Sequence, residues 1–333
     1  MIGGEVKALV WRGPNWMTVD EVPAPRPQTG EALVHSEATG ICGSEVEGYL
    51  GMMSNRVPPL VMGHEFAGTV TEVGESVDTS WLGKRVAVNP IVGCGHCTYC
   101  ASGGRNLCRE RYLLGVGVPG GFATSVSVPE RCLFEMPAGM DARLGALAEP
   151  LANGVHAIRQ GAPDGAKTAA VIGAGTIGLG CMQAALLHGI ASITVIERHP
   201  MRREHAKRLG AHSSHATAEG LRLGADLVVD AVGSEATRLL ALDLLNPGGT
   251  AVFIGMHTDE TPLPWRRVIR GNHTIRGVFA YSDKDFQQSI DWLAQGKAGI
   301  GALNAVLPLD EGPAAFALLA KGPTDDIKVF LSA

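Results

Sequence analysis

The sequence predicts an α/β protein with two domains, one rich in short strands and one built on a doubly wound parallel sheet. Three observations support this class. The 333 residues are too many for one hydrophobic core and suit two domains. Residues 1–150 alternate short apolar runs with turns rich in proline and glycine. From Thr168 the pattern becomes strand, glycine turn, helix and strand, which is typical of a parallel sheet covered on both faces.

The elements follow from short apolar runs and the turn residues between them. In the first part the candidate strands are Lys7–Trp11, Glu31–His35, Phe66–Val70 and Lys84–Val88. After Pro150 a helix is expected over Leu151–Ile158, leading into the second domain. There the pattern predicts a helix over Thr176–His188 and strands over Ala169–Ile172, Ser192–Ile196, Asp226–Asp230, Thr250–Ile254 and Thr274–Val278. Beyond about residue 282 the mixed pattern returns, with a helix over Phe286–Ala294 and a last strand over Lys328–Leu331.

Composition excludes several classes of function. Hydrophobic residues make up 45% and charged residues 18%, which is the balance of a globular enzyme. The net charge of −5 offers no basic excess for phosphate backbones, so we expect no nucleic-acid partner. The start, Met1–Lys7, lacks a charged region followed by an apolar run, and no apolar stretch of about 20 residues could span a membrane. A cytoplasmic protein is expected.

Four of the seven cysteines lie within one short segment, residues 93–108. Their spacing is C-x2-C-x2-C-x7-C, formed by Cys94, Cys97, Cys100 and Cys108. Four thiolates on one lobe suit a closed tetrahedral zinc site that contributes folding energy rather than chemistry. A disulfide cluster is the alternative, but nothing at the N-terminus indicates secretion. We therefore predict a structural zinc.

A glycine-rich motif, G-x-G-x-x-G, spans Gly173–Gly178. Alone this motif is weakly specific, but here it follows the strand ending at Ile172 and opens a helix. Gly173 permits a tight turn, Gly175 lets backbone approach a pyrophosphate, and Gly178 lets helix and strand pack closely. The helix N-terminus would supply free N–H groups and partial positive charge. The sequence thus predicts a dinucleotide site formed by Gly173, Gly175, Thr176, Ile177, Gly178, Glu197 and Arg198.

The choice between NAD and NADP depends on the end of the second strand of this domain. Glu197 stands 24 residues after Gly173, where a carboxylate could bind the adenosine ribose and repel a 2′-phosphate. Arg198 follows immediately, with Arg202 and Arg203 close behind, and these could bind such a phosphate instead. We expect NAD, with NADP as the alternative.

A second group of candidate metal ligands lies outside the cysteine lobe. Cys42 and His64 are zinc-ligand types on turns between predicted strands, and Glu149 stands at the junction of the two domains. Three protein ligands and one open position are the arrangement of a catalytic zinc. A single cysteine or histidine is more often structural, but the neighbouring zinc lobe and dinucleotide motif strengthen this assignment.

Taken together, these motifs resemble the zinc-dependent medium-chain dehydrogenase/reductase (alcohol dehydrogenase) family over essentially the whole chain. The resemblance rests on Gly40–Ser44, Gly63–Gly68, the cysteine lobe, Glu149-Pro150 and Val171–Gly178. It implies a GroES-like catalytic domain over residues 1–150 and 283–333, carrying the zinc lobe, and a Rossmann domain over residues 151–282, with zinc in the cleft between them. Glutamate rather than cysteine at position 149 is similar to the polyol, threonine and butanediol dehydrogenase branch.

The resemblance also implies roles for individual residues. Cys42, His64 and Glu149 would hold the catalytic zinc, giving two zinc ions per chain with the lobe. Glu65 would support or transiently replace a ligand, and Ser44 would occupy the position of the hydroxyl that contacts the substrate oxygen. Zinc would lower the pKa of the alcohol, and hydride would pass from the alkoxide to the nicotinamide.

Two departures from the family pattern bear on substrate and proton transfer. Positions 45 and 47, where the family usually has aspartate and often histidine, hold Glu45 and Glu47, so Glu47 could relay protons or the route could differ. The arginine that precedes the tyrosine in sorbitol dehydrogenases is replaced by Ala280 before Tyr281, which weakens the case for sorbitol itself.

The expected activity is NAD(H)-linked oxidation of a secondary alcohol, polyol or cyclitol-like small molecule to a ketone. The alternative is an NADPH-dependent carbonyl or enone reductase of the same fold, which the arginines near Glu197 would favour. By resemblance we expect a homodimer or homotetramer formed through the sheet edge near Thr274–Phe279.

Overall fold

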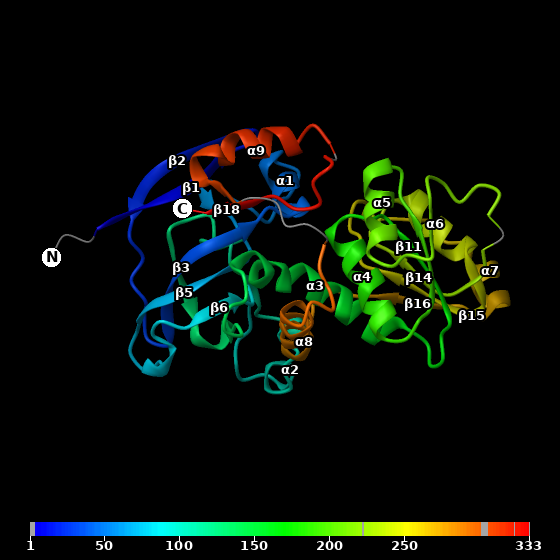
Figure 1. Cartoon of the computed structure of the whole chain (residues 1–333), viewed down its shortest axis with the longest axis horizontal. Coiled ribbons are helices and arrows are strands. Elements are labelled where there is room, and N and C mark those ends of the chain that lie inside the picture. The colour runs from blue at the N-terminus through cyan, green and yellow to red at the C-terminus, as the bar shows by residue number, and fades with distance from the viewer. Residues whose placement is uncertain (1–3, 222, 301–305, 323, 333) are drawn as a thin grey trace. The chain divides into compact units, whose positions relative to one another are not determined.

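The computed structural model describes residues 4–221, 223–300, 306–322 and 324–332. These residues form two compact units. Unit 1 comprises Met1–Glu149, Ser282–Lys297 and Leu303–Ala333, and unit 2 comprises Pro150–Tyr281 and Ala298–Ala302. Figure 1 shows the elements of both units. No helix within the described ranges combines the length and the apolar character that a membrane crossing requires.

Unit 1 is built mainly from antiparallel strands. A sheet in the order β2-β1-β4 lies beside one whose path is β10-β6-β5-β3-β18-β17, with β9 also paired to β3. Its strands are β1 (Glu5–Gly13), β2 (Trp16–Pro23), β3 (Glu31–Gly40), β4 (Leu60–Val61), β5 (Glu65–Val73), β6 (Arg85–Val88), β7 (Ile91–Val92), β8 (Tyr112–Leu113), β9 (Ser125–Pro129), β10 (Leu133–Glu135), β17 (Val306–Pro308) and β18 (Phe330–Ser332).

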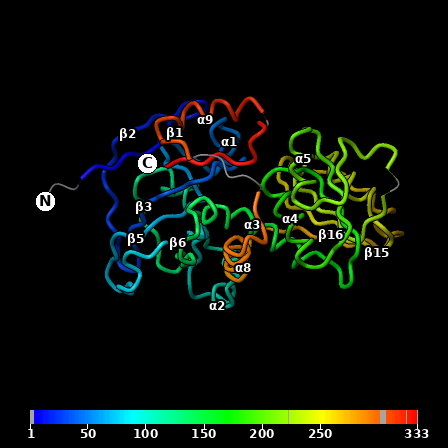
Figure 2. The backbone as a smooth tube through the Cα atoms, viewed as in Figure 1, coloured from blue at the N-terminus to red at the C-terminus, as the bar shows by residue number. Residues whose placement is uncertain are grey.

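Helices complete unit 1. They are α1 (Gly43–Tyr49), α2 (Thr98–Ala101), α8 (Asp283–Ala294) and α9 (Gly312–Leu319), together with the first part of α3 (Ala142–Gly161). One buried cluster joins strands β1 and β18 to α9 through Leu9, Phe316 and Leu331. In the backbone trace of Figure 2 the red C-terminal part of the chain runs among the blue N-terminal part. Strand β18 pairs antiparallel with β3, with Phe330 opposite Gly40 and Leu331 opposite Thr39. Phe330 and Leu331 therefore lie against the end of β3.

Unit 2 is a six-stranded sheet in the order β13-β12-β11-β14-β15-β16, and every pair is parallel. Its strands are β11 (Thr168–Ile172), β12 (Ser192–Ile196), β13 (Ser213–His215), β14 (Ala225–Asp230), β15 (Leu245–Phe253) and β16 (Thr274–Gly277). Its helices are α4 (Thr176–Leu187), α5 (Pro200–Arg208), α6 (Glu235–Asp243) and α7 (Trp265–Gly271). The strand order reverses between β11 and β14, which is where sheets of this type bind ligands.

The fold class agrees with this structure and each expected strand overlaps an observed one, although bounds shift and several short elements were not expected. Three of the differences concern the site and its surroundings. Helix α3 begins at Ala142 rather than at Leu151 and contains Pro150 in its interior. Strand β13 was not anticipated, because its polar sequence Ser213–His215 carries no apolar run. Cys42 was expected on a turn and instead caps the N-terminus of the short helix α1.

Candidate active site and metal centres

Cys42, His64 and Glu65 form a compact group of potential metal ligands in unit 1. One ligand atom from each lies within 4.8 Å of the others. Strand β3 ends at Gly40, and the chain then turns so that Cys42 becomes the N-cap of α1. Glu65 is the first residue of β5, the strand that pairs with β3, and His64 immediately precedes it. The pairing of β3 with β5 therefore brings Cys42 and His64 together, with Glu65 as the carboxylate of the group.

The buried carboxylate of Glu45 orients the imidazole ring of His64 through a contact with Nδ1. Its side chain is fully buried, and its Oε1 accepts hydrogen bonds from the backbone N–H of Gly63 (2.8 Å) and His64 (2.9 Å) and lies 2.8 Å from His64 Nδ1. Its Oε2 accepts the N–H of Cys42 at 2.9 Å. A neutral His64 that donates Nδ1–H to this carboxylate would present the Nε2 lone pair to a metal, which is the common arrangement in metal sites.

The pKa values of this pair reflect their mutual charge. Burial would raise the pKa of Glu45, but the charge and hydrogen bond of His64 and the nearby Arg56 lower it to about 2. Burial likewise disfavours the His64 imidazolium, yet the Glu45 carboxylate and the Cys42 sulfur raise the pKa of His64 well above its ordinary value. Glu45 is thus ionised at neutral pH. Its position three residues after the helix cap matches a capping-box glutamate, a signal that could have identified it.

Glu65 is held by a buried lysine from the other end of the chain. Lys328 Nζ donates to both carboxylate oxygens of Glu65 at 2.6 and 2.9 Å and to the carbonyl oxygen of Ile41 at 3.1 Å. The two side chains are only 2% and 1% exposed. Burial would lower the pKa of Lys328, but the Glu65 charge raises it, so the lysine stays charged. Sequence reasoning missed Lys328 because 263 positions separate the partners.

Ser44 and Glu149, the other two predicted site residues, do not belong to this group of ligands. Ser44 lies in the first turn of α1, is half-buried, and its Oγ accepts a hydrogen bond of 3.3 Å from Arg56 Nη2. Glu149 is buried in α3 and is 8% exposed. It is not a member of the compact group, in which the carboxylate is that of Glu65.

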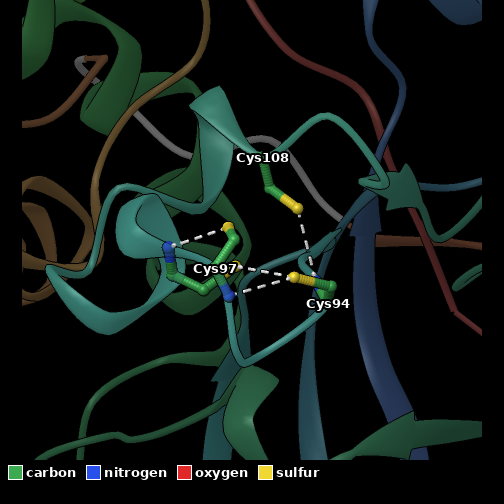
Figure 3. Close-up of side chains that lie close together, drawn as sticks. Cys94, Cys97 and Cys108 are labelled. Carbon is green, nitrogen blue, oxygen red and sulfur yellow. Dashed lines mark hydrogen bonds between the residues drawn. The ribbon is translucent and has the colours of Figure 1, made fainter.

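The four-cysteine lobe brings all its sulfurs together. Cys94, Cys97, Cys100 and Cys108 lie with their sulfur atoms within 4.8 Å of one another, and all seven cysteines of the chain are free thiols. Backbone N–H groups point at these sulfurs: Cys97 donates to Cys94 and Cys94 donates to Cys108, both at 3.4 Å, while Cys100 donates to Cys97 at 3.5 Å (Figure 3). These contacts favour thiolates, and four thiolates around one point fit a closed tetrahedral zinc.

The glycine loop of unit 2 follows β11 and opens α4. Gly173 has φ +91°, a left-handed conformation that favours glycine. A Cβ at Gly178 would collide with the carbonyl oxygen of Gly173, so both positions require a missing side chain. The predicted loop is therefore present, and the free N–H groups of the α4 N-terminus belong to it.

Glu197 follows β12 and reaches back to this loop. Its Oε2 accepts the N–H of Ala174 at 2.8 Å, and its Oε1 accepts the N–H of His199 at 2.7 Å. Arg203 Nη1 donates to the carbonyl oxygens of Glu197 and Arg198, whereas the side chain of Arg198 is exposed. Arg202 extends towards Gly175, and its buried Nε has no hydrogen-bond partner within the described residues. Glu197 is thus fixed beside the loop, and Arg202 Nη1 would lie 3.8 Å from a Cβ added at Gly175.

Comparison with known proteins agrees with this geometry. Residues 28–138 match the family model of the alcohol dehydrogenase GroES-like domain, and residues 176–295 match that of the zinc-binding dehydrogenase. The chain is 30% identical over 328 residues to 2-dehydro-3-deoxy-L-galactonate 5-dehydrogenase of Pseudoalteromonas atlantica, covering 95% of this chain and 96% of that protein. It is 31% identical over 306 residues to sorbitol dehydrogenase of Bacillus subtilis, covering 87% and 86%.

Solved structures show the same similarity. An Escherichia coli alcohol dehydrogenase (rspB) in complex with NADH superimposes with a TM-score of 0.92 at 28% identity, over 99% of this chain and 100% of that one. L-idonate 5-dehydrogenase of Escherichia coli gives 0.89 at 26% identity, over 99% and 98%. These matches confirm the expected GroES-like and Rossmann folds. The chain belongs to the zinc-dependent medium-chain alcohol dehydrogenase family, as an NAD(P)-linked dehydrogenase of alcohols.

Proposed function

We propose that the protein oxidises a secondary alcohol of a polyol or sugar acid to a ketone, with NAD as hydride acceptor and a zinc ion held by Cys42, His64 and Glu149. The observation that carries this proposal is the pairing of Cys42 with a His64 ring oriented by the buried Glu45 carboxylate. The relatives named as dehydrogenases of sorbitol, L-idonate and a deoxygalactonate support this substrate class.

The donor set fits zinc. A thiolate, an imidazole and a carboxylate are among its usual ligands, and the histidine already has the carboxylate partner that such ligands require. Lys328 binds both carboxylate oxygens of Glu65. This favours Glu149 as the third ligand, and Glu65 would replace a ligand only transiently. Bound zinc would supply Lewis acidity that lowers the pKa of the alcohol. Ser44 would hydrogen-bond the substrate oxygen and take part in moving its proton.

The substrate oxygen loses its proton before hydride transfer, because hydride leaves readily only from an alkoxide. Glu149 and Cys42 would bring two negative charges to a bound zinc. The fully ionised Glu45 adds a third nearby charge, which Arg56 partly offsets. Kinetics with a panel of polyols, aldonates and aminocyclitols, each with NAD and NADP, tests the proposal. Turnover of none of them would refute it, and turnover of carbonyl or enone substrates alone with NADPH would favour the reductase alternative.

We further propose a second, structural zinc in the cysteine lobe. Its backbone N–H groups already surround the sulfurs, so thiolates are stabilised without a catalytic opening. Cys97→Ser should lower the zinc content by one equivalent and the melting temperature together. Because the lobe needs reduced thiols, we propose a cytoplasmic location for the protein.

NAD is the proposed cofactor because Glu197 is fixed next to the glycine loop. Two backbone N–H groups hold its carboxylate, which retains lone pairs for the ribose hydroxyls and would repel a 2′-phosphate. Gly173, Gly175, Thr176, Ile177 and Gly178 would receive the pyrophosphate, with Arg198 and Arg202 at its border. A higher kcat/KM with NADP than with NAD would contradict this assignment.

A further inference from the structure

Arg56 is a buried cation beside the proposed active site that no sequence motif singled out. Its side chain is 4% exposed, in the loop between α1 and β4. It packs across α1 at Gly48, where an added Cβ would lie 2.7 Å from Arg56 Cδ. The missing side chain at position 48 thus provides the space through which Arg56 crosses the helix.

The guanidinium has few partners for its five N–H groups. Nη1 lies 3.0 Å from the sulfur of Met62, Nη2 donates to Ser44 Oγ at 3.3 Å, and Nε has no partner within the described residues. No carboxylate in the described part of the chain forms an ion pair with it, although its charge helps to lower the pKa of Glu45. Burying a cation with so few hydrogen bonds is costly. Its one hydrogen bond to a hydroxyl group therefore indicates a role for that contact.

The direction of that bond is fixed by chemistry. A guanidinium has donors and no acceptor, so Ser44 Oγ must accept, and its own O–H remains to be donated elsewhere. Ser44 stands two residues after Cys42 and keeps part of its surface accessible. Its hydroxyl is thus preset as a hydrogen-bond donor.

We propose that Arg56 is a positioning residue that holds the Ser44 hydroxyl as a donor to the oxygen of the reacting alcohol or ketone. The inference rests on the proposed function, because it requires that oxygen to lie beside Ser44. A hydroxyl already oriented towards a developing alkoxide stabilises its charge without reorganising at the moment of reaction. Arg56 therefore acts through Ser44 and contacts neither metal nor substrate in this scheme.

A double-mutant cycle tests the proposal with the zinc-loaded protein and the best substrate of the panel. Arg56→Met removes every donor at similar length and should lower kcat roughly 10- to 100-fold, with little change in KM for NAD, zinc content or melting temperature. Arg56→Lys should recover part of the loss. In a Ser44→Ala background, adding Arg56→Met should have almost no further effect on kcat. Met62→Leu, which removes only the sulfur contact, serves as the matched control and should leave kcat unchanged.

The results of this double-mutant cycle distinguish a failure of the role proposed for Arg56 from a failure of the proposed function. If Arg56→Met slows turnover as much in Ser44→Ala as in the unmodified protein, or releases zinc, Arg56 does not act through Ser44 and the inference is wrong. If Arg56→Met does not fold, the same cycle with Arg56→Lys decides, because a partial loss that disappears without Ser44 supports the proposal and a persistent loss overturns it. An unmodified protein that turns over none of the alcohols refutes the proposed function, and the inference with it.

Discussion

The candidate zinc site consists of potential metal ligands and of buried charged residues that hold those ligands. Cys42, His64 and Glu65 face one another, and Glu45 and Lys328 support two of them from behind. Both supporting side chains are almost fully buried and charged, so each depends on its partner. Buried charges are tolerated only when they are paired and hydrogen-bonded. Replacing either supporting residue should therefore disturb the ligand that it holds.

Glu45 should control zinc affinity at the catalytic site. Glu45→Gln keeps the shape but removes the charge that holds His64 Nδ1–H, so we expect zinc to bind about 10- to 100-fold more weakly at that site. As the chelator concentration is raised, the variant should lose one equivalent of zinc at a lower concentration than the unmodified protein, while the lobe zinc stays bound. Glu47→Gln, on the same helix, is the control and should retain both equivalents. Unchanged affinity in Glu45→Gln would show that His64 needs no carboxylate partner.

Lys328 should matter for stability because it neutralises Glu65 in the interior. Lys328→Met leaves a buried carboxylate without its cation, which should cost about 3–5 kcal/mol in the free energy of unfolding. Adding Glu65→Gln should restore most of that loss, since no charge then remains. The exposed pair Lys84–Glu135 provides the comparison, and Lys84→Met should cost below about 1 kcal/mol. Equal costs for the two lysine variants in denaturant unfolding would contradict the argument.

Among the secondary-structure elements, those with strong local signals were predictable and those set by distant contacts were not. The parallel strands of unit 2, the glycine loop and the cysteine lobe each carry their pattern within about 20 residues. By contrast, the pairing of β18 with β3 places Lys328 against Glu65, and no local pattern encodes that contact. Arg56 was not predicted for a similar reason, because it lies in a loop and its hydrogen-bond partner, Ser44, lies in helix α1.

Helix α3 shows how a local rule can mislead. Proline is unfavourable inside a helix, and a helix was expected only after Pro150, over Leu151–Ile158. The structure continues the helix through it, and the buried Ser289 hydroxyl of α8 donates to the carbonyl oxygen of Ala148 at 2.8 Å. Glu149 therefore lies inside a helix, one residue before the proline.

The N-terminal end of β14 provides a pH-dependent prediction. Asp226 accepts the backbone N–H of Lys167 at 2.9 Å and Thr168 at 3.1 Å, and Asn246 Nδ2 at 3.0 Å. The bond from Lys167, followed by that from Asn246, lowers the pKa of Asp226 to about 2. Since the folded pKa lies below the unfolded value of about 3.9, this carboxylate stabilises the fold above about pH 4, and that stabilisation is lost as pH falls towards 2.

Asp226→Asn should therefore reduce stability at pH 7 by about 1 kcal/mol, because solvent screening reduces the full linkage value. The difference between variant and unmodified protein should shrink as pH falls from 5 to 3. Denaturant midpoints at matched pH values measure it, and subtracting the two proteins removes the pH effects that both share. Asp259→Asn, an exposed change in the same unit, is the control. A difference that stays constant with pH would show that the charge of Asp226 is not responsible.

At the scale of the whole molecule, one edge of the parallel sheet of unit 2 is left open by the described strands. Strand β16 ends the parallel sheet of unit 2 and pairs only with β15 among the described strands. Beside it α7 exposes Trp265 and Ile269, which are 60% and 74% exposed, and Phe279 follows the strand at 37%. An unpaired edge bordered by apolar side chains is a surface that proteins usually cover. We therefore propose that a second copy of the chain covers this edge in a homodimer or homotetramer.

Charge introduced at that edge should weaken the association. Phe279→Lys places an ammonium group where the second copy would exclude water, and an unpaired charge there is costly. We expect light scattering after size exclusion to shift from dimer or tetramer towards the 34.8 kDa monomer. Trp16→Lys replaces another exposed aromatic residue, 59% exposed on unit 1, and should leave the mass unchanged. An unmodified protein that runs as a monomer, or equal shifts in both variants, would show that the β16 edge is not the interface.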